Sequence, residues 1–404
     1  MKNYFFEIKY IFILLLCAAA FVSAFVSKQK AAEAFMTKEK QDSIVMTEEI
    51  PLAIEYLSNA TLPSGRFVYL TNLNPQVKYN SKKYNALRHA GTLYSMYLCE
   101  KYLNDYTLQK QRYKASEYFI KNYVKKISPD MFAVVSKMEE EKLDSPQAKL
   151  GGSGLALIGL SNLYPDKKVD LETIRGLGNF IIYMQKSDGS FYSKYLVDAK
   201  QKDENFVSLY YPGEAALGLL YLYDVDPQPK WIAASKNTLL YLANSRKNKG
   251  TDVPFDHWAM LATKKLFETQ NNTLTKDEKI LLQKHAEQMA NSILSKQITD
   301  AKDPLVGSFR GNARLCSIGT MMEGLVAIYA VVDNEDLKHR VMNGLRLGTR
   351  FLGRYQVKTG DKKGGLPNNA YWRSAKAGNK SKEIRIDNVQ HVLSAWITFN
   401  ELFK

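Results

Sequence analysis

The sequence contains few of the residues that build disulfide frameworks and metal centres. Its 404 residues include only three cysteines and five histidines. Cys17 lies inside an apolar N-terminal stretch, so Cys99 and Cys316 could form at most one internal disulfide. A disulfide-stapled scaffold and a cysteine-rich zinc site are therefore excluded. We predict neither a metal nor a cofactor for this chain.

The short motifs of several enzyme classes are also missing. The sequence has no phosphate-binding GxxxxGK[ST] loop, no GxGxxG dinucleotide turn, no HExxH zinc motif and no GxSxG nucleophile turn. It lacks the DxDD acid motif of terpenoid cyclases and the cysteine–histidine zinc set of lanthionine cyclases. Both cyclase activities are therefore poorly supported.

Long apolar runs are confined to the N-terminus. Tyr10–Val26 carries no charge and follows two lysines, which is typical of a secretory signal, and Val22–Ala24 offers a small-residue cleavage site. Its seventeen residues also reach the lower limit of a membrane-spanning helix. Residues 1–30 are therefore either a signal peptide or a membrane anchor. Both alternatives place residues 31–404 outside the cytoplasmic membrane, in the periplasm or anchored and facing outward.

Helical periodicity dominates the rest of the chain, and strand signals are scarce. Some segments are apolar over most of their surface, often rich in Gly and Ala, and such helices are buried. They are Tyr84–Tyr102, Leu150–Tyr164, Pro212–Tyr223, Asp256–Phe267, Cys316–Val331 and Asp387–Phe403. Amphipathic segments with charged faces, typical of surface helices, alternate with them. These are Leu108–Val124, Leu171–Gln185, Lys230–Ser245, Lys276–Lys296 and Leu337–Tyr355, with Ile50–Ser58 as a sixth.

Six buried helices alternating with surface helices predict an all-α fold, an (α/α)6 toroid. In this fold, inner helices line the core and outer helices shield them. Residues 31–404 would form this single domain, since their length supports one large core. The spacing of the buried helices is irregular, so the repeat is structural and not a strict sequence repeat. An irregular helical solenoid or bundle is the alternative.

The turns add a resemblance to known proteins. Gln185–Phe191 (QKSDGSF) resembles the Gln…Asp-Gly-Ser-aromatic repeat of squalene–hopene cyclases and other α/α toroids, with Phe191 in place of the usual Trp. Gly307–Gly311 and Gly364–Leu366 occupy comparable places and offer the positive φ values of tight turns.

At the level of architecture, the chain resembles six-hairpin glycosidases, toroidal uronate lyases, acylglucosamine 2-epimerases and glucuronyl C5-epimerases. Phe309–Ala313 is similar to an Arg-Gly turn of unsaturated glucuronyl hydrolases. The resemblance implies a carbohydrate-active toroid without choosing among these activities.

Polar residues gather at the beginnings of the predicted inner helices. In a ring these N-termini open on one face, where unpaired N–H groups and helix dipoles give a positive potential that suits anions. The candidate catalytic residues are His89, Glu214, Asp256, His257, Glu323, Asp387 and His391. The candidate substrate-binding residues, which include aromatic side chains suited to sugar rings, are Arg88, Tyr210, Tyr211, Arg310, Arg314, Tyr371, Trp372 and Arg385.

Several candidates also have a purely structural explanation. Asp256 and Asp387 stand at predicted N-cap positions, where capping alone would explain an acid. Glu214 follows a first-turn proline, where an acid complements the helix dipole. Glu323 lies inside an apolar helix, and a buried carboxylate needs a partner, for which Arg314 or Arg385 is available. His391 could equally pack in the core.

The net charge of +15, from 56 Lys and Arg against 41 Asp and Glu, raises the question of nucleic acid. No nucleic-acid motif is present, the lysines are scattered, and the expected export argues against such a partner. We therefore expect an exported or membrane-anchored enzyme that acts on an acidic polysaccharide or oligosaccharide, with the N-terminal segment contacting the membrane.

The reaction expected of such an enzyme is hydrolysis, β-elimination or epimerisation. A hydrolase needs two carboxyl groups flanking the bond. A lyase or an epimerase needs a base and a cation that neutralises the uronate. The alternative is a non-catalytic polysaccharide-binding or assembly protein of the cell envelope.

Overall fold

The computed structural model describes residues 46–403, apart from residues 81, 104–107, 271–272 and 312. The predicted signal or anchor, residues 1–30, lies outside the described residues. No helix of the described part of the chain combines the length and the apolar character that crossing a membrane requires. Residues Glu48–Leu402 form one compact unit.

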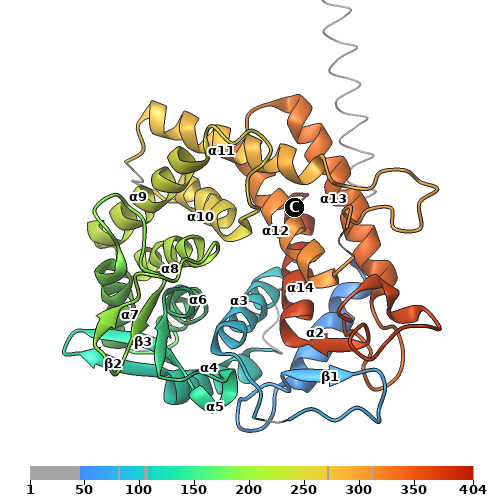
Figure 1. Cartoon of the computed structure of the whole chain (residues 1–404), viewed down its shortest axis with the longest axis horizontal. Coiled ribbons are helices and arrows are strands. Elements are labelled where there is room, and N and C mark those ends of the chain that lie inside the picture. Colours follow the sequence, from blue (N-terminus) through green and yellow to red (C-terminus); the bar gives the residue numbers. More distant parts are fainter. Residues whose placement is uncertain (1–45, 81, 104–107, 271–272, 312, 404) are drawn as a thin grey trace, which may run out of the picture. The chain divides into compact units, whose positions relative to one another are not determined.

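The predicted inner helices are present and form a closed ring (Figure 1). Each packs against the next, and the last packs against the first. They are α3 (Ala86–Leu103), α6 (Leu150–Leu160), α8 (Tyr211–Val225), α10 (His257–Glu268), α12 (Leu315–Val331) and α14 (Ile386–Glu401). Their all-round burial follows from their composition: every residue of α6 is buried, and its small residues let α8 approach closely.

The amphipathic helices surround this ring, as predicted (Figure 1). Each buries its apolar face against an inner helix or a neighbouring outer helix and leaves its charged face to solvent. They are α2 (Glu49–Ala60), α4 (Gln109–Tyr123), α7 (Leu171–Met184), α9 (Pro229–Arg246), α11 (Lys276–Leu294) and α13 (Glu335–Tyr355). The prediction of an (α/α)6 toroid is confirmed.

The structure adds short strands that helical periodicity did not indicate. Strands of two to six residues form an antiparallel sheet in the order β2 (Val124–Ser128), β3 (Met131–Ser136), β4 (Gln147–Lys149), β5 (Lys194–Leu196) and β6 (Gln201–Lys202). A second ladder pairs β1 (Leu70–Asn72) with β7 (Glu383–Arg385). One further short helix is α5 (Met138–Glu141), and the 3-10 turns are η2 (Ser161–Leu163) and η3 (Ala370–Arg373). Strands this short carry almost no periodic signal.

Glycine turns connect the outer helices and share one geometry. Each has a glycine with φ between 82° and 94°, the left-handed region that favours glycine. Each glycine lies directly against the next outer helix: a Cβ at Gly189 would lie 2.6 Å from the carbonyl oxygen of Asn237. Gly65 contacts α4 in this way, Gly189 contacts α9, Gly307 contacts α13 and Gly364 contacts α2. The sequence motif at Gln185–Phe191 is therefore one of four equivalent turns in the described structure.

Three of these turns are hydrogen-bonded to the next outer helix by a glutamine side chain. Each glutamine lies at the end of the preceding outer helix or just after it. Nε2 of Gln185 donates to the carbonyl oxygen of Ala234 on α9 at 2.9 Å. Gln297 and Gln356 donate to backbone carbonyls of α13 and α2, also at 2.9 Å. The turn geometry and this amide together fix each outer helix relative to the next.

Replacing Gly189 with Ala should destabilise the fold strongly. The left-handed backbone costs alanine about 1–2 kcal/mol, and the contact with Asn237 adds a cost of about 1–3 kcal/mol for overpacking. The matched control is Gly360→Ala, whose φ of 80° is similar but whose Cβ would meet nothing within 4 Å. Denaturant unfolding should show that Gly189→Ala lowers the free energy of unfolding more than Gly360→Ala does. Equal losses would mean that the close approach does not contribute.

Candidate active site

The first turns of the inner helices surround a cavity of about 600 Å³. Arg88 comes from the start of α3, Glu214 from α8, His257 from α10, and Asp387 and His391 from α14. The helix N-termini therefore open on one face of the ring, as the sequence predicts. Tyr210, Tyr211, Arg314 and Arg385 also line this cavity.

Two histidines and a glutamate converge at the wall of the cavity. Oε2 of Glu323 lies 2.8 Å from Nδ1 of His391 and 3.8 Å from Nε2 of His257. The two imidazole rings are 5.3 Å apart between centroids and stand edge to face. Trp258 packs against both rings. Glu323, only 1% exposed, thus has a histidine as its partner, where the sequence suggested Arg314 or Arg385.

The environments of the two imidazoles differ. Burial lowers the pKa of His257 well below its usual value of 6.5, and His391 lowers this pKa further. Neither ring nitrogen of His257 has a hydrogen-bond partner among the described residues. His257 is therefore neutral at pH 7 and unpaired, whereas Glu323 fixes the ring of His391.

The carboxylate of Glu323 is itself held by His391. Burial raises the pKa of Glu323, and the charge and hydrogen bond of His391 oppose this rise. When Glu323 is ionised it can only accept, so Nδ1 of His391 donates to it and Nε2 of His391 remains for a ligand.

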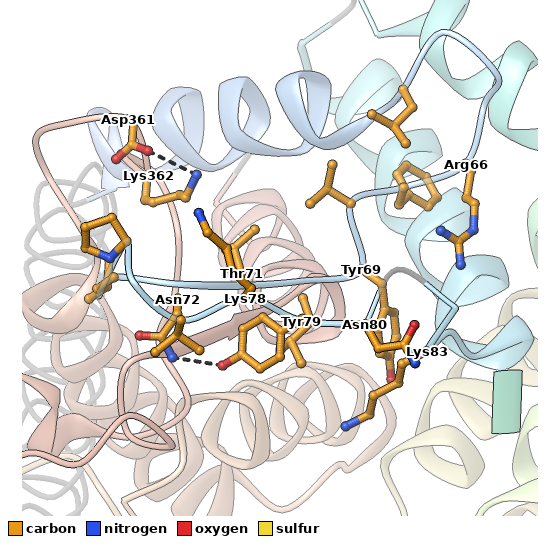
Figure 2. A pocket seen from close by; sticks show the side chains of 17 residues that line it. Arg66, Tyr69, Thr71, Asn72, Lys78, Tyr79, Asn80, Lys83, Asp361 and Lys362 are labelled. Atoms are coloured by element: carbon orange, nitrogen blue, oxygen red, sulfur yellow. Dashed lines mark hydrogen bonds and ion pairs between the residues drawn. The ribbon is translucent and has the colours of Figure 1, made fainter. Parts of the chain in front are cut away.

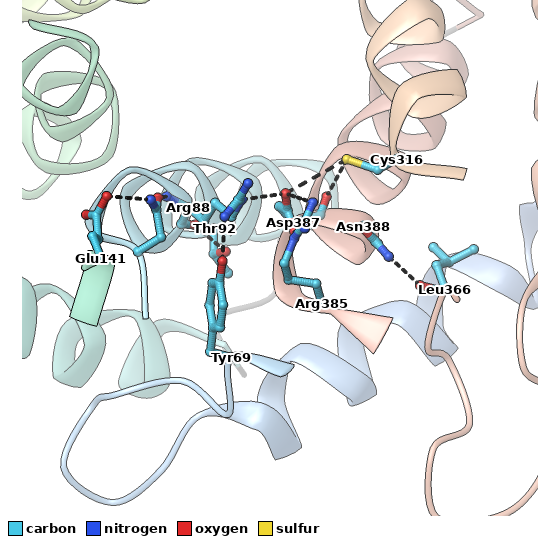
Figure 3. A network of polar contacts seen from close by, with 10 residues as sticks. Tyr69, Arg88, Thr92, Glu141, Cys316, Leu366, Arg385, Asp387 and Asn388 are labelled. Atoms are coloured by element: carbon cyan, nitrogen blue, oxygen red, sulfur yellow. Dashed lines mark hydrogen bonds and ion pairs between the residues drawn. The ribbon is translucent and has the colours of Figure 1, made fainter. Parts of the chain in front are cut away.

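An arginine pair clamps Asp387 beside the histidines (Figure 3). Nε of Arg88 donates to Oδ2 of Asp387 at 2.8 Å, and Arg385 binds the same carboxylate with two nitrogens. Tyr69 accepts a further hydrogen bond from Arg88. The group carries a net charge of one positive unit, and about a third of each arginine side chain is exposed. It can therefore bind an anion in the cavity.

Glu214 is a buried carboxyl group in the cavity wall. Burial, reinforced by the charge of Asp256, raises its pKa from 4.5 to about 8. Its Oε2 has no hydrogen-bond partner among the described residues. The residue lies in the first turn of α8, where the sequence placed it, but it is a neutral acid at pH 7 rather than an anion that complements the helix dipole.

Three candidate catalytic residues do not line the cavity: Glu323, which reaches it only through His391, and His89 and Asp256. His89 is fully buried, accepts from the hydroxyl of Tyr84 at Nδ1, and donates from Nε2 to the carbonyl of Ala115. Asp256 caps α10 and pairs with Arg246 at 3.1 Å. Asp256 therefore has the N-cap role that the sequence offers for it, and His89 is a core residue. For Asp387 the predicted N-cap role is wrong, because Arg385 is the N-cap of α14 and Asp387 lies inside the first turn.

Three candidate binding residues also lie away from the cavity. Arg310 is exposed, and Tyr371 in η3 is 54% exposed. Trp372 donates from Nε1 to the carbonyl of Tyr355 and lines a different groove. The loop that carries Tyr371 and Trp372 is hydrogen-bonded to the first residue of α12, but these two side chains do not line the cavity.

Other lining residues were not among the sequence candidates. Trp258 and Gln390 are each adjacent in sequence to a candidate histidine, and this was the available signal for them. Lys380 and Glu383 come from the segment before α14 and reach the cavity because β7 pairs with β1. No periodicity or motif in the sequence could indicate that pairing.

The histidine–glutamate cluster also offers three metal-ligating atoms. His257, Glu323 and His391 each provide one, all within 4.8 Å of one another. A histidine bound to a metal usually donates its second ring N–H to a partner, and Nδ1 of His257 has none among the described residues. The arrangement fits proton transfer better than metal binding.

A second cavity, of about 570 Å³, lies along β1 (Figure 2). Its lining includes Lys78 and Lys83, and the one carboxylate among its described lining residues, Asp361, pairs with Lys362 at 3.1 Å. Asn72 donates to the hydroxyl of Tyr79 at its edge. The described part of its lining contains no convergent pair of titratable groups comparable to the histidines, so we assign the chemistry to the first cavity.

No model of a known protein family and no curated protein matches this sequence. Solved structures do match its fold. An α-1,6-mannanase of a Salegentibacter species, bound to α-1,6-mannotriose, has a TM-score of 0.58 at 10% identity over 88% of this chain and 99% of that chain. A cellobiose 2-epimerase from Bacillus thermoamylovorans has a TM-score of 0.61 at 14% identity over 90% and 98%.

An unsaturated glucuronyl hydrolase specific for heparin has a TM-score of 0.57 at 14% identity over 88% of this chain and 96% of that chain. These neighbours are six-hairpin glycosidase-like (α/α)6 toroid proteins, and they are carbohydrate-active enzymes. At such low identity the likeness establishes the fold, which this chain shares with them.

Replacing Asp387 with Asn should destabilise the protein by about 1–3 kcal/mol at neutral pH, because two arginines lose their shared partner. Burial alone would raise the pKa of Asp387, but Arg88 and Arg385 outweigh it and hold this pKa below 3.8. The stabilisation is therefore complete above the unfolded-state pKa and is lost as pH falls through the folded-state pKa.

Thermal unfolding would be measured for Asp387→Asn and for the wild-type protein between pH 7 and pH 3. The wild-type protein should have the higher Tm at pH 7, and this difference in Tm should shrink below about pH 4. The control is Asp361→Asn, which removes an exposed ion pair and should change little. A difference that stayed constant across this range would contradict the ionised clamp.

Proposed function

We propose that this chain is a carbohydrate-active enzyme that moves a proton at a sugar carbon next to a carbonyl or carboxylate group. The reaction class is epimerisation or β-elimination, and the substrate is an acidic saccharide. The observation that carries the proposal is the convergence of two differently held histidines, His257 and His391, on one cavity. Two imidazoles in such an arrangement can act as base and acid.

In this mechanism, His257 takes the proton. Its ring is neutral and its nitrogens are unpaired, so it can accept the proton from carbon while the electron pair moves onto the adjacent carbonyl or carboxylate oxygen. His391 acts as the acid when both of its ring nitrogens carry a proton: Nδ1–H stays on Glu323, and the Nε2 proton goes to carbon in epimerisation or to the leaving oxygen in elimination. Arg88 and Arg385 stabilise the negative charge that develops on oxygen.

Most of the carboxyl groups that the sequence offers for hydrolysis are already bound to a cation or to a histidine. A glycosidase needs one acid and one free carboxylate across the scissile bond. Asp387 is bound to two arginines, Asp256 is bound to Arg246 outside the cavity, and Glu323 is occupied by His391. Among the described lining residues this leaves Glu383, whose Oε1 accepts a hydrogen bond from the hydroxyl of Tyr79 at 3.1 Å, as the one carboxylate beside Glu214 that is not bound to a cation.

The acidic nature of the substrate is supported by the charge of the cavity. Arg88 and Arg385 exceed the charge of Asp387, and Lys380 lies nearby. The lining also contains Tyr210, Tyr211 and Trp258, which suit the faces of sugar rings. Among the fold neighbours, the heparin-specific hydrolase acts on an acidic glycan and the cellobiose epimerase carries out epimerisation. Export rests on the sequence of residues 1–30 alone.

Replacing His257 or His391 with Asn should lower kcat by about 10²–10⁴-fold and leave ligand affinity within a few fold. Turnover of a panel of uronate-containing oligosaccharides would be followed in D2O. Either reaction class should introduce deuterium at the sugar carbon or produce an unsaturated uronate. Because the pKa of His257 lies below 6.5, the acid limb of kcat/KM should also lie below that pH.

The matched control is His339→Asn, an exposed histidine on the outer helix α13. Release of new reducing ends without deuterium or unsaturated product would show hydrolysis instead. Saturable binding without turnover would favour a polysaccharide-binding or assembly protein. Loss of activity with a chelator, restored by a divalent cation, would favour a metal at the same cluster.

A further inference from the structure

Glu214 occupies a slot that a glycine leaves open. A Cβ at Gly151 on α6 would lie 1.8 Å from Oε2 of Glu214 and 2.5 Å from Cδ1 of Tyr211. Any larger residue at position 151 would therefore push the carboxyl group out of its place. Glu214 is 5% exposed and lines the cavity, while its Oε2 is buried in the slot and has no hydrogen-bond partner among the described residues. A buried polar atom in this state calls for a ligand or a functional explanation.

The groups that face Glu214 include no cation that would neutralise it. From α6 it meets the backbone of Gly151 and Gly154, which carry no charge. From α10 comes the negative charge of Asp256, itself paired with Arg246, and the neutral ring of His257 lines the same cavity. From its own helix and the residue before it come Tyr211 and Tyr210, whose pKa values burial raises, so both stay neutral.

We propose that Glu214 contacts the substrate as a neutral carboxylic acid and donates its O–H to a carboxylate oxygen of an acidic sugar. This inference rests on the proposed function and names the group by which that same cavity selects its substrate. The arginine pair on α3 and β7 attracts the anion, and Glu214 completes its hydrogen bonds from α8. A carboxylic acid that donates to a carboxylate forms a short, charge-assisted hydrogen bond.

The neutral form makes the selection depend on pH. Once Glu214 loses its proton, two negative groups face each other in a buried site, and an anionic ligand is repelled. A neutral sugar does not suffer this repulsion, because its hydroxyl groups can donate to the ionised side chain. Affinity for an anionic ligand should therefore fall above the pKa of Glu214, which is about 8, while affinity for its neutral counterpart should not.

The test measures the dissociation constants of trigalacturonate and of its methyl ester between pH 6 and pH 9.5 by calorimetry. The wild-type protein should bind trigalacturonate with constant affinity up to about pH 7 and lose about tenfold per pH unit above pH 8. Glu214→Gln keeps a donor and cannot ionise, so its affinity should be close to the wild-type value at pH 6 and independent of pH. Glu214→Ala should bind at least about tenfold more weakly at pH 6.

A double-mutant cycle tests the slot. Gly151→Ala should weaken binding of trigalacturonate at pH 6 about as much as Glu214→Ala does, and should add little when Glu214 is already Ala. The matched control is Gly152→Ala, one residue further along α6, whose Cβ would meet the side chains of Val134 at 3.1 Å and Leu87 at 3.3 Å but neither Glu214 nor Tyr211. Circular dichroism and thermal unfolding would show that each variant is folded before its affinity is compared.

The inference is overturned if trigalacturonate does not bind at pH 6, if its affinity in the wild-type protein does not change across pH 8, or if Glu214→Ala binds it normally. Its failure is distinguishable from failure of the proposed function, because binding is measured without turnover. A protein that binds trigalacturonate in the expected manner but never exchanges deuterium refutes the reaction and keeps the recognition. Full turnover with a normal KM in Glu214→Ala refutes the recognition by Glu214 and keeps the reaction.

Discussion

The ring depends on close backbone contacts that only glycine permits. Where α6 meets α8, a Cβ at Gly154 or at Gly218 would lie 2.4 Å from a carbonyl oxygen of the other helix. The turns at the outer helices use positive-φ glycines for the same purpose. Because such contacts leave no room for a side chain, the angular position of each helix pair is fixed, and the first turns of the inner helices meet on one face.

The charged groups at that face are arranged according to how each buried charge is compensated. Asp387 has two arginines, Glu323 has the hydrogen bond from His391, and Asp256 has Arg246. Glu214 has no cation and keeps its proton instead. Glu214 and the unpaired His257 are therefore the two buried polar groups of the cavity that have the least compensation from the described residues.

The sequence predicted the inner and outer helices well. An inner helix is apolar on all sides and an outer helix on one face, and both patterns can be recognised in the order of apolar and polar residues. It placed His257, His391 and Glu214 correctly at helix starts, but whether they converge is a property of the ring and not of any local pattern. His89 shows the limit: it stands in an equivalent position on α3 and points outward to Tyr84 and Ala115. The β1–β7 ladder joins segments more than three hundred residues apart, and no local signal encodes it.

The order of the ring along the chain has a consequence for biosynthesis. α14, the last inner helix, is the one that packs against α3 and brings both His391 and Asp387. During synthesis, the earlier helices therefore precede α14, and until it docks, α3 and α12 expose the apolar surfaces that it will cover and Glu323 lacks His391. The cavity is complete only when the final hairpin docks, so an interrupted or truncated polypeptide exposes apolar surface and lacks the assembled cavity.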